Sequence, residues 1–506
     1  SMMPSGLLNT LAADEIVGIT VAKTTPSGLA FSPAWRLVDF NGSAASSCGF
    51  LSTARHLDCG PLDAAGSPYR IEISDNGEND TGSYSVYYQR LTDAQSCDQT
   101  ALTCDVPTTG QIDNPLDTDL FSIAVADNEI ISVTVLKGSP TGVDFQPAWR
   151  LLKSDGALAD DCGNVSSAPQ RDCGPLPASG SPYRVELSDQ GGNDTGAYRV
   201  RFSRSTASAA CEQTPIVCDL PLAGQISPGS DSYLFSFSVV QGETVAVQVV
   251  KSAPAGLNFA PSWRLIAGDG DRADACSGFT TATLQNCGPL PVAGNPYRIE
   301  VTDTNNDDTG AYNVRLQRIT AGQACEVSPL TCDVPSAGQI NNPLDSDLFS
   351  LTVSTTEQIS VQVIPGTPSG LNFRPAWRLL DAAGAGAGGC GLLSTAATRA
   401  CGPLEPGGSP YSIEVFDQST DDTGAYQLRF QRLTQSAACE SAPLVCDVPA
   451  SGAIVSSLDT DLWSFTAVDG ERSALPAVAN VGEPAQVSPS WRLLNPHAST
   501  ATACGS

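Results

Sequence analysis

Residues 97–107 read CDQTALTCDVP, and three later stretches repeat this pattern of two cysteines with six residues between them. The later copies are CEQTPIVCDLP at 211–221, CEVSPLTCDVP at 325–335 and CESAPLVCDVP at 439–449. Each copy starts 114 residues after the one before. A fixed period indicates tandem copies of one unit, and a unit of this length can bury a core of its own. The sequence therefore predicts separate domains in series, joined at these stretches.

Five Trp-Arg pairs share the same spacing, at Trp35-Arg36, Trp149-Arg150, Trp263-Arg264, Trp377-Arg378 and Trp491-Arg492. The predicted domains are module 1 at 1–103, which lacks its start, module 2 at 104–217, module 3 at 218–331, module 4 at 332–445, and the first half of module 5 at 446–506. We interpret the chain as a segment of a longer repetitive protein. Its last half module is either truncated or completed by another chain.

Short runs of β-branched and aromatic residues fill each module, and no segment has a helical period. In module 2 they lie at 120–125, 131–135, 147–152, 183–187 and 198–202. Glycine, proline and asparagine turns separate them, which is typical of an all-β fold of tandem antiparallel β-sandwich modules, jelly-roll-like in form. The last two runs predict a hairpin whose turn carries Asp194-Thr195-Gly196.

The motif Asp117-Thr118-Asp119-Leu120-Phe121 opens module 2, and a late Pro-Tyr-Arg run with Asp-Thr-Gly-x-Tyr closes it. Residues 345–349 and 459–463 repeat the opening motif, whereas module 3 has Tyr233 at the second aspartate. This order resembles the bacterial pre-peptidase C-terminal domain, a β-sandwich, here in tandem copies. The resemblance implies calcium as a ligand and a role as an appendage of a secreted hydrolase.

Sixteen of the 17 cysteines form two repeating series. Four cysteines per module allow three connectivities, among which sequence cannot choose, and we favour the local pairs. The predicted disulfides are Cys48–Cys59, Cys97–Cys104, Cys162–Cys173, Cys211–Cys218, Cys276–Cys287, Cys325–Cys332, Cys390–Cys401 and Cys439–Cys446. Metal binding is the alternative, but the series lack CxxC spacing and neighbouring histidines. Disulfides indicate an extracellular or cell-surface location. Cys504 has no partner within the chain, and an intermolecular bond there is an alternative.

The composition is strongly acidic, with 54 acidic and 26 basic residues and a formal charge of −28. Such a surface repels nucleic acid and anionic membranes. No run of 18 apolar residues exists, so membrane insertion is not expected.

Acidic residues near the predicted turns are candidate calcium ligands, because calcium takes six to eight oxygen ligands. They are Asp117, Asp119, Asp189, Asp194, Asp303, Asp308, Asp345, Asp347, Asp417 and Asp422. Ordinary turn and capping chemistry is the alternative. In aspartic proteases the Asp-Thr-Gly triplet follows an apolar strand, whereas the triplets of this chain do not. They fit a turn in which Asp bonds its own backbone and Gly supplies a positive φ.

The repeated tryptophans are expected in the core, with sugar stacking as the alternative, and their arginines are expected to pair with acidic neighbours. His56 and His497 are not at equivalent positions and belong to no HExxH or GxSxG motif, so we expect no enzyme. Weak N-glycosylation signals occur at Asn41, Asn79, Asn164 and Asn193.

A constant repeat length in an exported chain without catalytic groups predicts a structural component of an extracellular fibre, stalk or surface filament. Self-association into a homopolymer would use strand addition at sheet edges, with docking near 1–11 and 473–486. One alternative is an adhesin or glycan-binding array, in which repeated modules give avidity. Its variable loops, at 153–171, 270–286 and 383–400, hold a single aromatic residue, Phe279, which favours the structural hypothesis. A second alternative is the non-catalytic tail of a secreted hydrolase.

Overall fold

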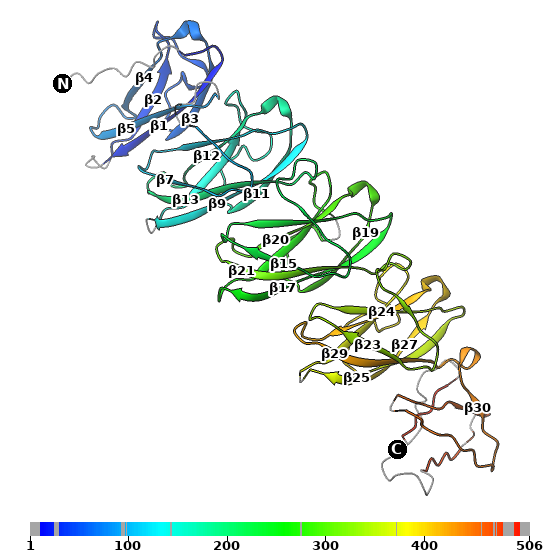
Figure 1. Cartoon of the computed structure of the whole chain (residues 1–506). Helices are drawn as coiled ribbons and strands as arrows, with labels where there is room; N and C mark the ends of the chain where they lie inside the picture. The colour runs from blue at the N-terminus through cyan, green and yellow to red at the C-terminus, as the bar shows by residue number, and fades with distance from the viewer. Residues whose placement is uncertain are drawn as a thin grey trace.

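A computed structural model describes residues 11–24, 30–92, 97, 99–141, 144–273, 276–370, 372–456, 458–468, 471, 473–478 and 490–495. Figure 1 shows a row of β-rich bodies that follow one another from the N-terminus toward the C-terminus. The described residues form strands and short 3-10 turns, without an α-helix. The all-β fold of tandem β-sandwich modules is therefore confirmed.

Two four-stranded sheets form module 2, with strand orders β10-β12-β8-β6 and β11-β9-β13-β7. The strands are β6 (Thr100–Ala101), β7 (Thr108–Ile112), β8 (Asp119–Ile123), β9 (Glu129–Thr141), β10 (Pro147–Leu152), β11 (Gln170–Leu176), β12 (Tyr183–Asp189) and β13 (Gly196–Arg204). All pairs are antiparallel except β6 with β8, which is parallel.

Modules 3 and 4 repeat this arrangement strand for strand. Module 3 consists of β14 (Thr214–Pro215), β15 (Leu222–Ile226), β16 (Ser232–Phe237), β17 (Glu243–Ala255), β18 (Pro261–Ile266), β19 (Leu284–Leu290), β20 (Tyr297–Asp303) and β21 (Gly310–Arg318). Module 4 consists of β22 (Ser328–Pro329), β23 (Ser336–Ile340), β24 (Ser346–Leu351), β25 (Glu357–Ser369), β26 (Pro375–Leu380), β27 (Thr398–Leu404), β28 (Tyr411–Asp417) and β29 (Gly424–Arg432).

The described parts of modules 1 and 5 hold fewer strands. Module 1 has sheets β3-β1-β5 and β2-β4, and module 5 has the pair β30-β31. The strands are β1 (Glu15–Thr24), β2 (Pro33–Val38), β3 (His56–Leu62), β4 (Arg70–Asp75), β5 (Ser83–Arg90), β30 (Ala442–Pro443) and β31 (Trp463–Ser464). Short 3-10 turns are η1 (Ser46–Cys48), η2 (Ala64–Gly66), η4 (Ala178–Gly180), η5 (Val292–Gly294), η6 (Pro406–Gly408) and η7 (Gln435–Ala437).

Strands β6, β14, β22 and β30 lie between the two cysteines of each repeated stretch. Each pairs in parallel with an early strand of the module that follows. The predicted boundaries at 104, 218, 332 and 446 leave these strands on the side of the preceding module, whereas hydrogen bonding assigns them to the next one. The short strand within each repeated stretch therefore belongs to the sandwich that follows it.

The tryptophan of each Trp-Arg pair is a core residue in modules 1 to 4, where its exposed fraction is at most 1%. Its indole N–H donates to a backbone carbonyl in the variable loop, as from Trp149 to Ala168 at 3.2 Å and from Trp263 to Ala282 at 2.9 Å. The predicted core position is confirmed for these four. Trp491, in the described part of module 5, is 51% exposed.

The predicted hairpin is wrong, because β12 pairs with β10 and β8 while β13 pairs with β9 and β7. Alternation of apolar residues identifies the buried face of a strand but not its partner, and both strands turn that face to the core from opposite sheets. The positive φ at the intervening turn belongs to Gly192, not Gly196. The equivalent Gly310 serves close approach instead, since a Cβ there would lie 2.2 Å from the ring of Phe259.

Candidate functional site at the module junctions

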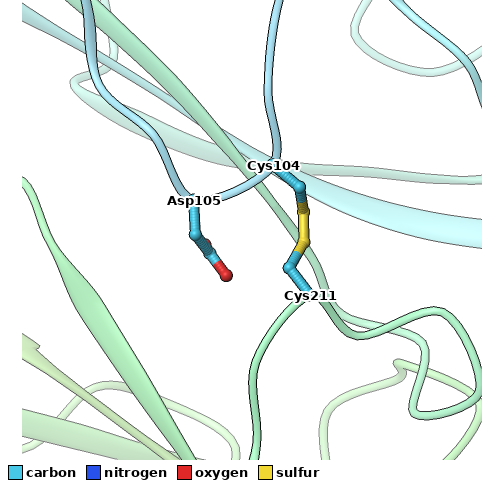
Figure 2. Close-up of side chains that lie close together, drawn as sticks. All are labelled: Cys104, Asp105 and Cys211. Atoms are coloured by element: carbon cyan, nitrogen blue, oxygen red, sulfur yellow. A yellow bond between two sulfur atoms is a disulfide. The ribbon is translucent and has the colours of Figure 1, made fainter.

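Three disulfides close whole modules. They join Cys104 to Cys211, Cys218 to Cys325, and Cys332 to Cys439, each across 107 residues. Figure 2 shows the first of them beside Asp105. The predicted pairs Cys97–Cys104, Cys211–Cys218, Cys325–Cys332 and Cys439–Cys446 are therefore wrong.

The reason lies in the strand between the two cysteines of each stretch. An extended chain advances about 3.3 Å per residue, and a disulfide requires Cα atoms within about 7 Å. With β6 extended between them, Cys97 and Cys104 are carried apart. Cys104 instead meets the end of its own module, with a Cα–Cα distance of 5.9 Å to Cys211. Cys97 and Cys446 are exposed free thiols, and Cys504 lies outside the described residues.

The second series of disulfides is confirmed. Cys48–Cys59, Cys162–Cys173, Cys276–Cys287 and Cys390–Cys401 each close a separation of 11 residues. The second cysteine of each pair lies on a strand that carries a polar residue immediately before it in modules 1 to 3, namely Asp58, Asp172 and Asn286. With seven disulfides in all, the described chain belongs to an oxidising compartment.

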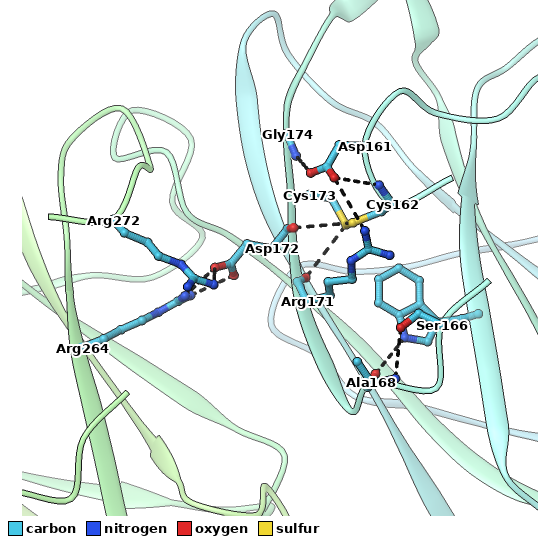
Figure 3. The surroundings of a disulfide bond; sticks show 11 residues. Asp161, Cys162, Ser166, Ala168, Arg171, Asp172, Cys173, Gly174, Arg264 and Arg272 are labelled. Atoms are coloured by element: carbon cyan, nitrogen blue, oxygen red, sulfur yellow. Dashed lines mark hydrogen bonds and ion pairs between the residues drawn. A yellow bond between two sulfur atoms is a disulfide. The ribbon is translucent and has the colours of Figure 1, made fainter. Parts of the chain in front are cut away.

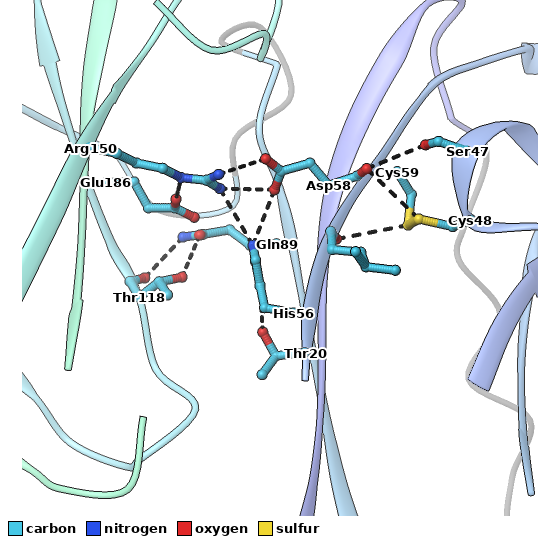
Figure 4. A network of polar contacts seen from close by, with 11 residues as sticks. Thr20, Ser47, Cys48, His56, Asp58, Cys59, Gln89, Thr118, Arg150 and Glu186 are labelled. Carbon is cyan, nitrogen blue, oxygen red and sulfur yellow. Dashed lines mark hydrogen bonds and ion pairs between the residues drawn. A yellow bond between two sulfur atoms is a disulfide. The ribbon is translucent and has the colours of Figure 1, made fainter. Parts of the chain in front are cut away.

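These three polar residues contact the next module. At the junction of modules 1 and 2, Arg150 on β10 donates two hydrogen bonds to Asp58 on β3, at 2.6 and 2.8 Å. Its Nε also pairs with Glu186 on the neighbouring strand β12. Figure 4 shows the guanidinium between the two carboxylates, with His56 beside them. His56 Nε2 lies 3.1 Å from Asp58 and its Nδ1 lies 2.8 Å from Thr20.

The junction of modules 2 and 3 repeats this contact. Arg264 on β18 pairs with Asp172 on β11, with one bond at 2.9 Å, and its Nε contacts Glu300 at 2.6 Å. Arg272 approaches the same aspartate from module 3 at 3.2 Å, as Figure 3 shows. The side chains of Arg264 and Glu300 are each 2% exposed, so the charge cluster is nearly closed to water. We call the arginine that follows the core tryptophan the latch arginine, and we call its contact with the preceding module the latch.

At the junction of modules 3 and 4 the latch uses an amide instead of a carboxylate. Arg378 donates to the Asn286 side chain at 2.9 Å and contacts Glu414 on its own module at 2.6 Å. The same geometry therefore persists without a negative charge on the preceding module. This natural difference provides a comparison between charged and neutral latches within one chain.

A second arginine reaches in the opposite direction, from the end of one module into the next. Arg201 on β13 contacts Asp105 of its own module at 2.6 Å, and Asp231 and Ser232 of module 3 at 3.1 Å each. The equivalent residues Arg315 and Arg429 repeat the contact, to Ser346 of module 4 and Thr460 of module 5, both at 3.0 Å. Every junction from module 2 onward is thus bridged by this second arginine.

Apolar packing supplements these polar contacts. Leu91 of module 1 packs with Leu120 and Leu152 of module 2, and all three are buried. The junction of modules 3 and 4 has a corresponding cluster, formed by Ala246 and Ile319 with Leu348 and Leu380. Each of these interfaces combines an apolar patch with buried charged groups, and independent domains on a flexible linker have no such interface.

Two opposing effects set the pKa values of the carboxyl groups at the junctions. Burial raises them, and nearby arginines lower them. Burial by itself raises the pKa of Asp172, but hydrogen bonds and charge from Arg264, with Arg272, outweigh it and lower the pKa below its ordinary value. Asp58 behaves in the same way beside His56 and Arg150. Asp105 differs, because burial and the nearby charge of Asp231 outweigh Arg201 and raise its pKa to about 6.

Among the described residues, no three of the predicted calcium ligands bring their carboxylate oxygens within 4.8 Å of one another. Asp189 Oδ1 accepts the Gln146 amide at 3.0 Å, and its Oδ2 accepts the amides of Asn193 and Asp194 at 3.0 and 3.2 Å, which is turn chemistry. Asp303 and Asp417 make the same turn contacts, because each accepts the backbone amide of the next predicted ligand, Asp308 and Asp422 respectively. Asp117 and Asp345 each accept a backbone amide, and Asp119 and Asp347 accept the hydroxyls of Tyr198 and Tyr426.

Within the described residues, only Asp303, Asp307 and Asp308 bring three carboxylate oxygens within 4.8 Å of one another. Asp307 was not among the predicted ligands, and the described residues of the other modules contain no such group of three carboxylates. Calcium binding therefore stays a prediction, which a titration of melting temperature with calcium would test.

Other predicted features lie on the surface. Asn41, Asn79, Asn164 and Asn193 are all exposed, and their glycosylation stays a prediction. His497 lies outside the described residues, as does most of the predicted docking range 473–486. In the part of the chain that the structure describes, no helix has the length and apolar character that crossing a membrane requires.

Sequence reasoning anticipated that the arginines would pair with acidic neighbours, and it missed that one partner lies in the preceding module. The available signal was the polar residue immediately before the second loop cysteine, which recurs in modules 1 to 3 at the same 114-residue spacing as the arginines. A disulfide beside that position restrains the polar side chain that the next module contacts.

No family model and no curated protein matches this chain. Among solved structures, it is similar to the pre-peptidase C-terminal domain of a collagenase from Bacillus anthracis, with 15% identity over 21% of this chain and 95% of that chain and a TM-score of 0.17. A lysozyme inhibitor of g-type lysozyme from Aeromonas hydrophila gives 18% identity over 21% and 96%, with a TM-score of 0.17. A triple jelly-roll protein of an archaeal virus gives 10% identity over 69% and 84%, with a TM-score of 0.13. Likenesses at these scores carry no argument about family or function.

Proposed function

We propose that this chain is a non-catalytic structural component of an extracellular fibre, stalk or surface filament, in which it acts as a stiff rod of disulfide-closed β-sandwiches. The observation that carries the proposal is the buried latch. At each junction from module 1 to module 4, an arginine anchored in one sandwich is hydrogen-bonded to a residue of the sandwich before it.

This geometry favours a rod because each latch restrains orientation as well as distance. The latch arginine is positioned by its own strand and by a glutamate on the neighbouring strand, and its target is positioned by the adjacent disulfide. At the junction of modules 3 and 4, two opposed arginines and an apolar patch act on different parts of one interface. A linker alone would leave the modules free to rotate.

The surface supports the same function. A charge of −28 keeps such chains soluble, and disulfides within every complete module suit a protein that is exposed outside the cell. Export itself is part of the proposal. The resemblance to domains appended to secreted hydrolases is compatible with export, and it does not require catalysis by this chain.

The test compares the wild-type chain with the triple variant Asp58→Ala, Asp172→Ala and Asn286→Ala in small-angle X-ray scattering. Each substitution removes the acceptor on the preceding module and leaves the latch arginine paired with its own glutamate. We expect the wild type to scatter as a long rod with a narrow cross-section, and the variant to become more compact on average as its junctions bend. Unchanged scattering would show that the latches do not set the stiffness.

A further inference from the structure

One arginine at the junction of modules 2 and 3 faces two carboxylates, one from each module. Arg201 Nη2 lies 2.6 Å from Asp105 Oδ1 of its own module and 3.1 Å from Asp231 Oδ1 of module 3. The arginine side chain is 3% exposed, and those of the two aspartates are 18% and 14% exposed. A single positive charge is therefore shared by two carboxylates to which water has little access.

The junction of modules 3 and 4 has the same arrangement. Arg315 contacts Asp219 of module 3, and its Nη2 lies 3.8 Å from Asp345 of module 4. The junction of modules 1 and 2 differs, because Tyr87 occupies the position of the arginine and its hydroxyl lies 3.5 Å from the backbone carbonyl of Thr118 in module 2. The sharing of one arginine by two aspartates is therefore a property of particular junctions.

Further acidic groups surround the pair at the junction of modules 2 and 3. Glu212, which precedes β14, acts on both aspartates, and Glu300 on β20 acts on the one in module 2. Glu300 is already paired with the latch arginine Arg264. The hydroxyl of Tyr233 on β16 hydrogen-bonds to Asp231. The shared arginine thus faces more negative charge than it can balance.

These surroundings raise the pKa values of the aspartates. Burial, together with the nearby carboxylates, outweighs the arginine and raises the pKa of Asp105 to about 6, and burial also raises the pKa of Asp231. At the next junction burial raises the pKa of Asp219, and the charges of Asp345 and Glu414 act in the same direction. A carboxyl group with a raised pKa binds a proton more readily in the closed joint than in water. By linkage, proton binding then stabilises the closed joint.

From this geometry we infer that the junctions of modules 2 and 3 and of modules 3 and 4 are proton-controlled joints, in which the aspartates that share one arginine take up a proton in weak acid and the modules close more tightly. The proton comes from the solvent, binds to a carboxylate oxygen and returns to the solvent when the pH rises. Its contribution is complete below about pH 4 and is lost as the pH rises through about 6. The inference rests on the proposed rod function and adds a control of the stiffness of the rod.

The latches do not respond over the same range. The pKa values of Asp58 and Asp172 lie below the ordinary value, so both carboxylates stay ionised from about pH 5 to about pH 7.5. His56 contacts Asp58 at 3.1 Å, and a histidine titrates within this range. The tests therefore concern the two later junctions, and chains used for scattering carry His56→Gln.

Hydrogen exchange of the full 506-residue chain measures the opening of each joint through a backbone bond that crosses it. The amide of Ala207 donates to Gly268 of module 3 at 2.9 Å, and the amide of Ala321 donates to Ala382 of module 4 at 2.9 Å. Exchange is followed by mass spectrometry at about pH 5 and about pH 7.5 and is corrected for the intrinsic pH dependence of amide exchange. For a carboxyl group that returns to its ordinary pKa when the joint opens, we expect opening to be about tenfold rarer at the lower pH.

Asp105→Asn imitates the protonated form, because an amide carries no charge and keeps an oxygen that accepts from Arg201. Asparagine also tolerates the positive φ of 61° at this position. We expect the protection of Ala207 in this variant to be high at both pH values. Asp144→Asn, which removes an exposed carboxylate of module 2, is the matched control and should keep the pH dependence of the wild type.

Asp219→Asn repeats the test at the next junction, with Ala321 as the reporter. Protection that does not change with pH in the wild type, or a pH dependence that survives these substitutions at both junctions, would overturn the inference. Small-angle scattering of the same chains keeps the rod function separate. Rods that are equally stiff at both pH values, with unchanged exchange, would refute the proton-controlled joint and leave the rod function standing, whereas chains that are bent at both pH values would refute the rod function.

Discussion

Replacing Arg264 with methionine is the most informative single change, because it removes the charge of a latch and retains much of the length of the side chain. The arginine and Glu300 are each 2% exposed, and Asp172 is 19% exposed. Breaking a buried ion pair by removing one partner costs about 3–5 kcal/mol, since the other charge is left without compensation. For a domain of this size, such a loss lowers the melting temperature by more than about 10 °C.

Arg36→Met provides the matched control at the equivalent position of module 1. Arg36 pairs with Glu72 of the same module, but the two side chains are 42% and 54% exposed. An exposed pair contributes about 0–1 kcal/mol. The double change Arg264→Met with Glu300→Met should recover part of the loss, because Glu300 is no longer left without a countercharge while Asp172 keeps its pair with Arg272.

Hydrogen exchange followed by mass spectrometry is the suitable assay, because it reports the opening free energy of each module separately. We expect peptides from β18 and β20 to lose protection in Arg264→Met, with little change in modules 1 and 4. Module 1 should lose little protection in the control. Equal effects of the two substitutions would refute the argument that burial gives the latch its strength.

The remaining predictions concern acid, disulfides and one buried carboxylate. Because the folded pKa of Asp172 is lowered, its latch contributes fully above about pH 4 and is lost as the pH falls further, so scattering at pH 2–3 should show bending at junctions with carboxylates while the neutral Asn286 latch persists. Rigidity of all junctions at low pH would contradict this. Replacing Cys218 and Cys325 by serine opens a long loop and should cost about 4.7 kcal/mol in urea unfolding, against about 3 for the short-loop pair of the same module; a larger loss from the short loop would contradict the ranking. Burial, with the charge of Asp345, outweighs the hydrogen bond from Tyr426 and raises the pKa of Asp347 to about 6, so its contribution is complete below about pH 4 and is lost as the pH rises through 6. Module 4 should therefore melt higher at pH 5 than at pH 7, and Asp347→Asn should abolish this difference.

Much of the fold could be predicted from the sequence because the period was constant and the strands were short and apolar. The core tryptophans followed from the same reasoning, since a large aromatic residue on a strand at a repeated position is buried when its N–H finds an acceptor. The short loop disulfides followed from proximity, as in Cys162–Cys173.

Predictions failed where the partner of a residue is distant in sequence. Cys104 and Cys97 are close along the chain but are separated by an extended strand, while Cys211 is 107 residues away and adjacent in space. The supposed hairpin of β12 and β13 failed similarly, because alternation fixes the buried face of a strand and leaves its neighbours open. The latch joins residues 92 positions apart, as in Arg264 with Asp172. Local sequence patterns therefore identified the arginines as residues that pair with acidic neighbours, but they did not show which residue each one contacts.

Electron microscopy of the native extracellular material tests the central claim most directly. If the chain is a stiff structural rod, the material should contain straight fibres with a regular axial spacing, in which successive sandwiches keep one orientation relative to one another. Isolated chains whose modules lie at variable angles would contradict the account.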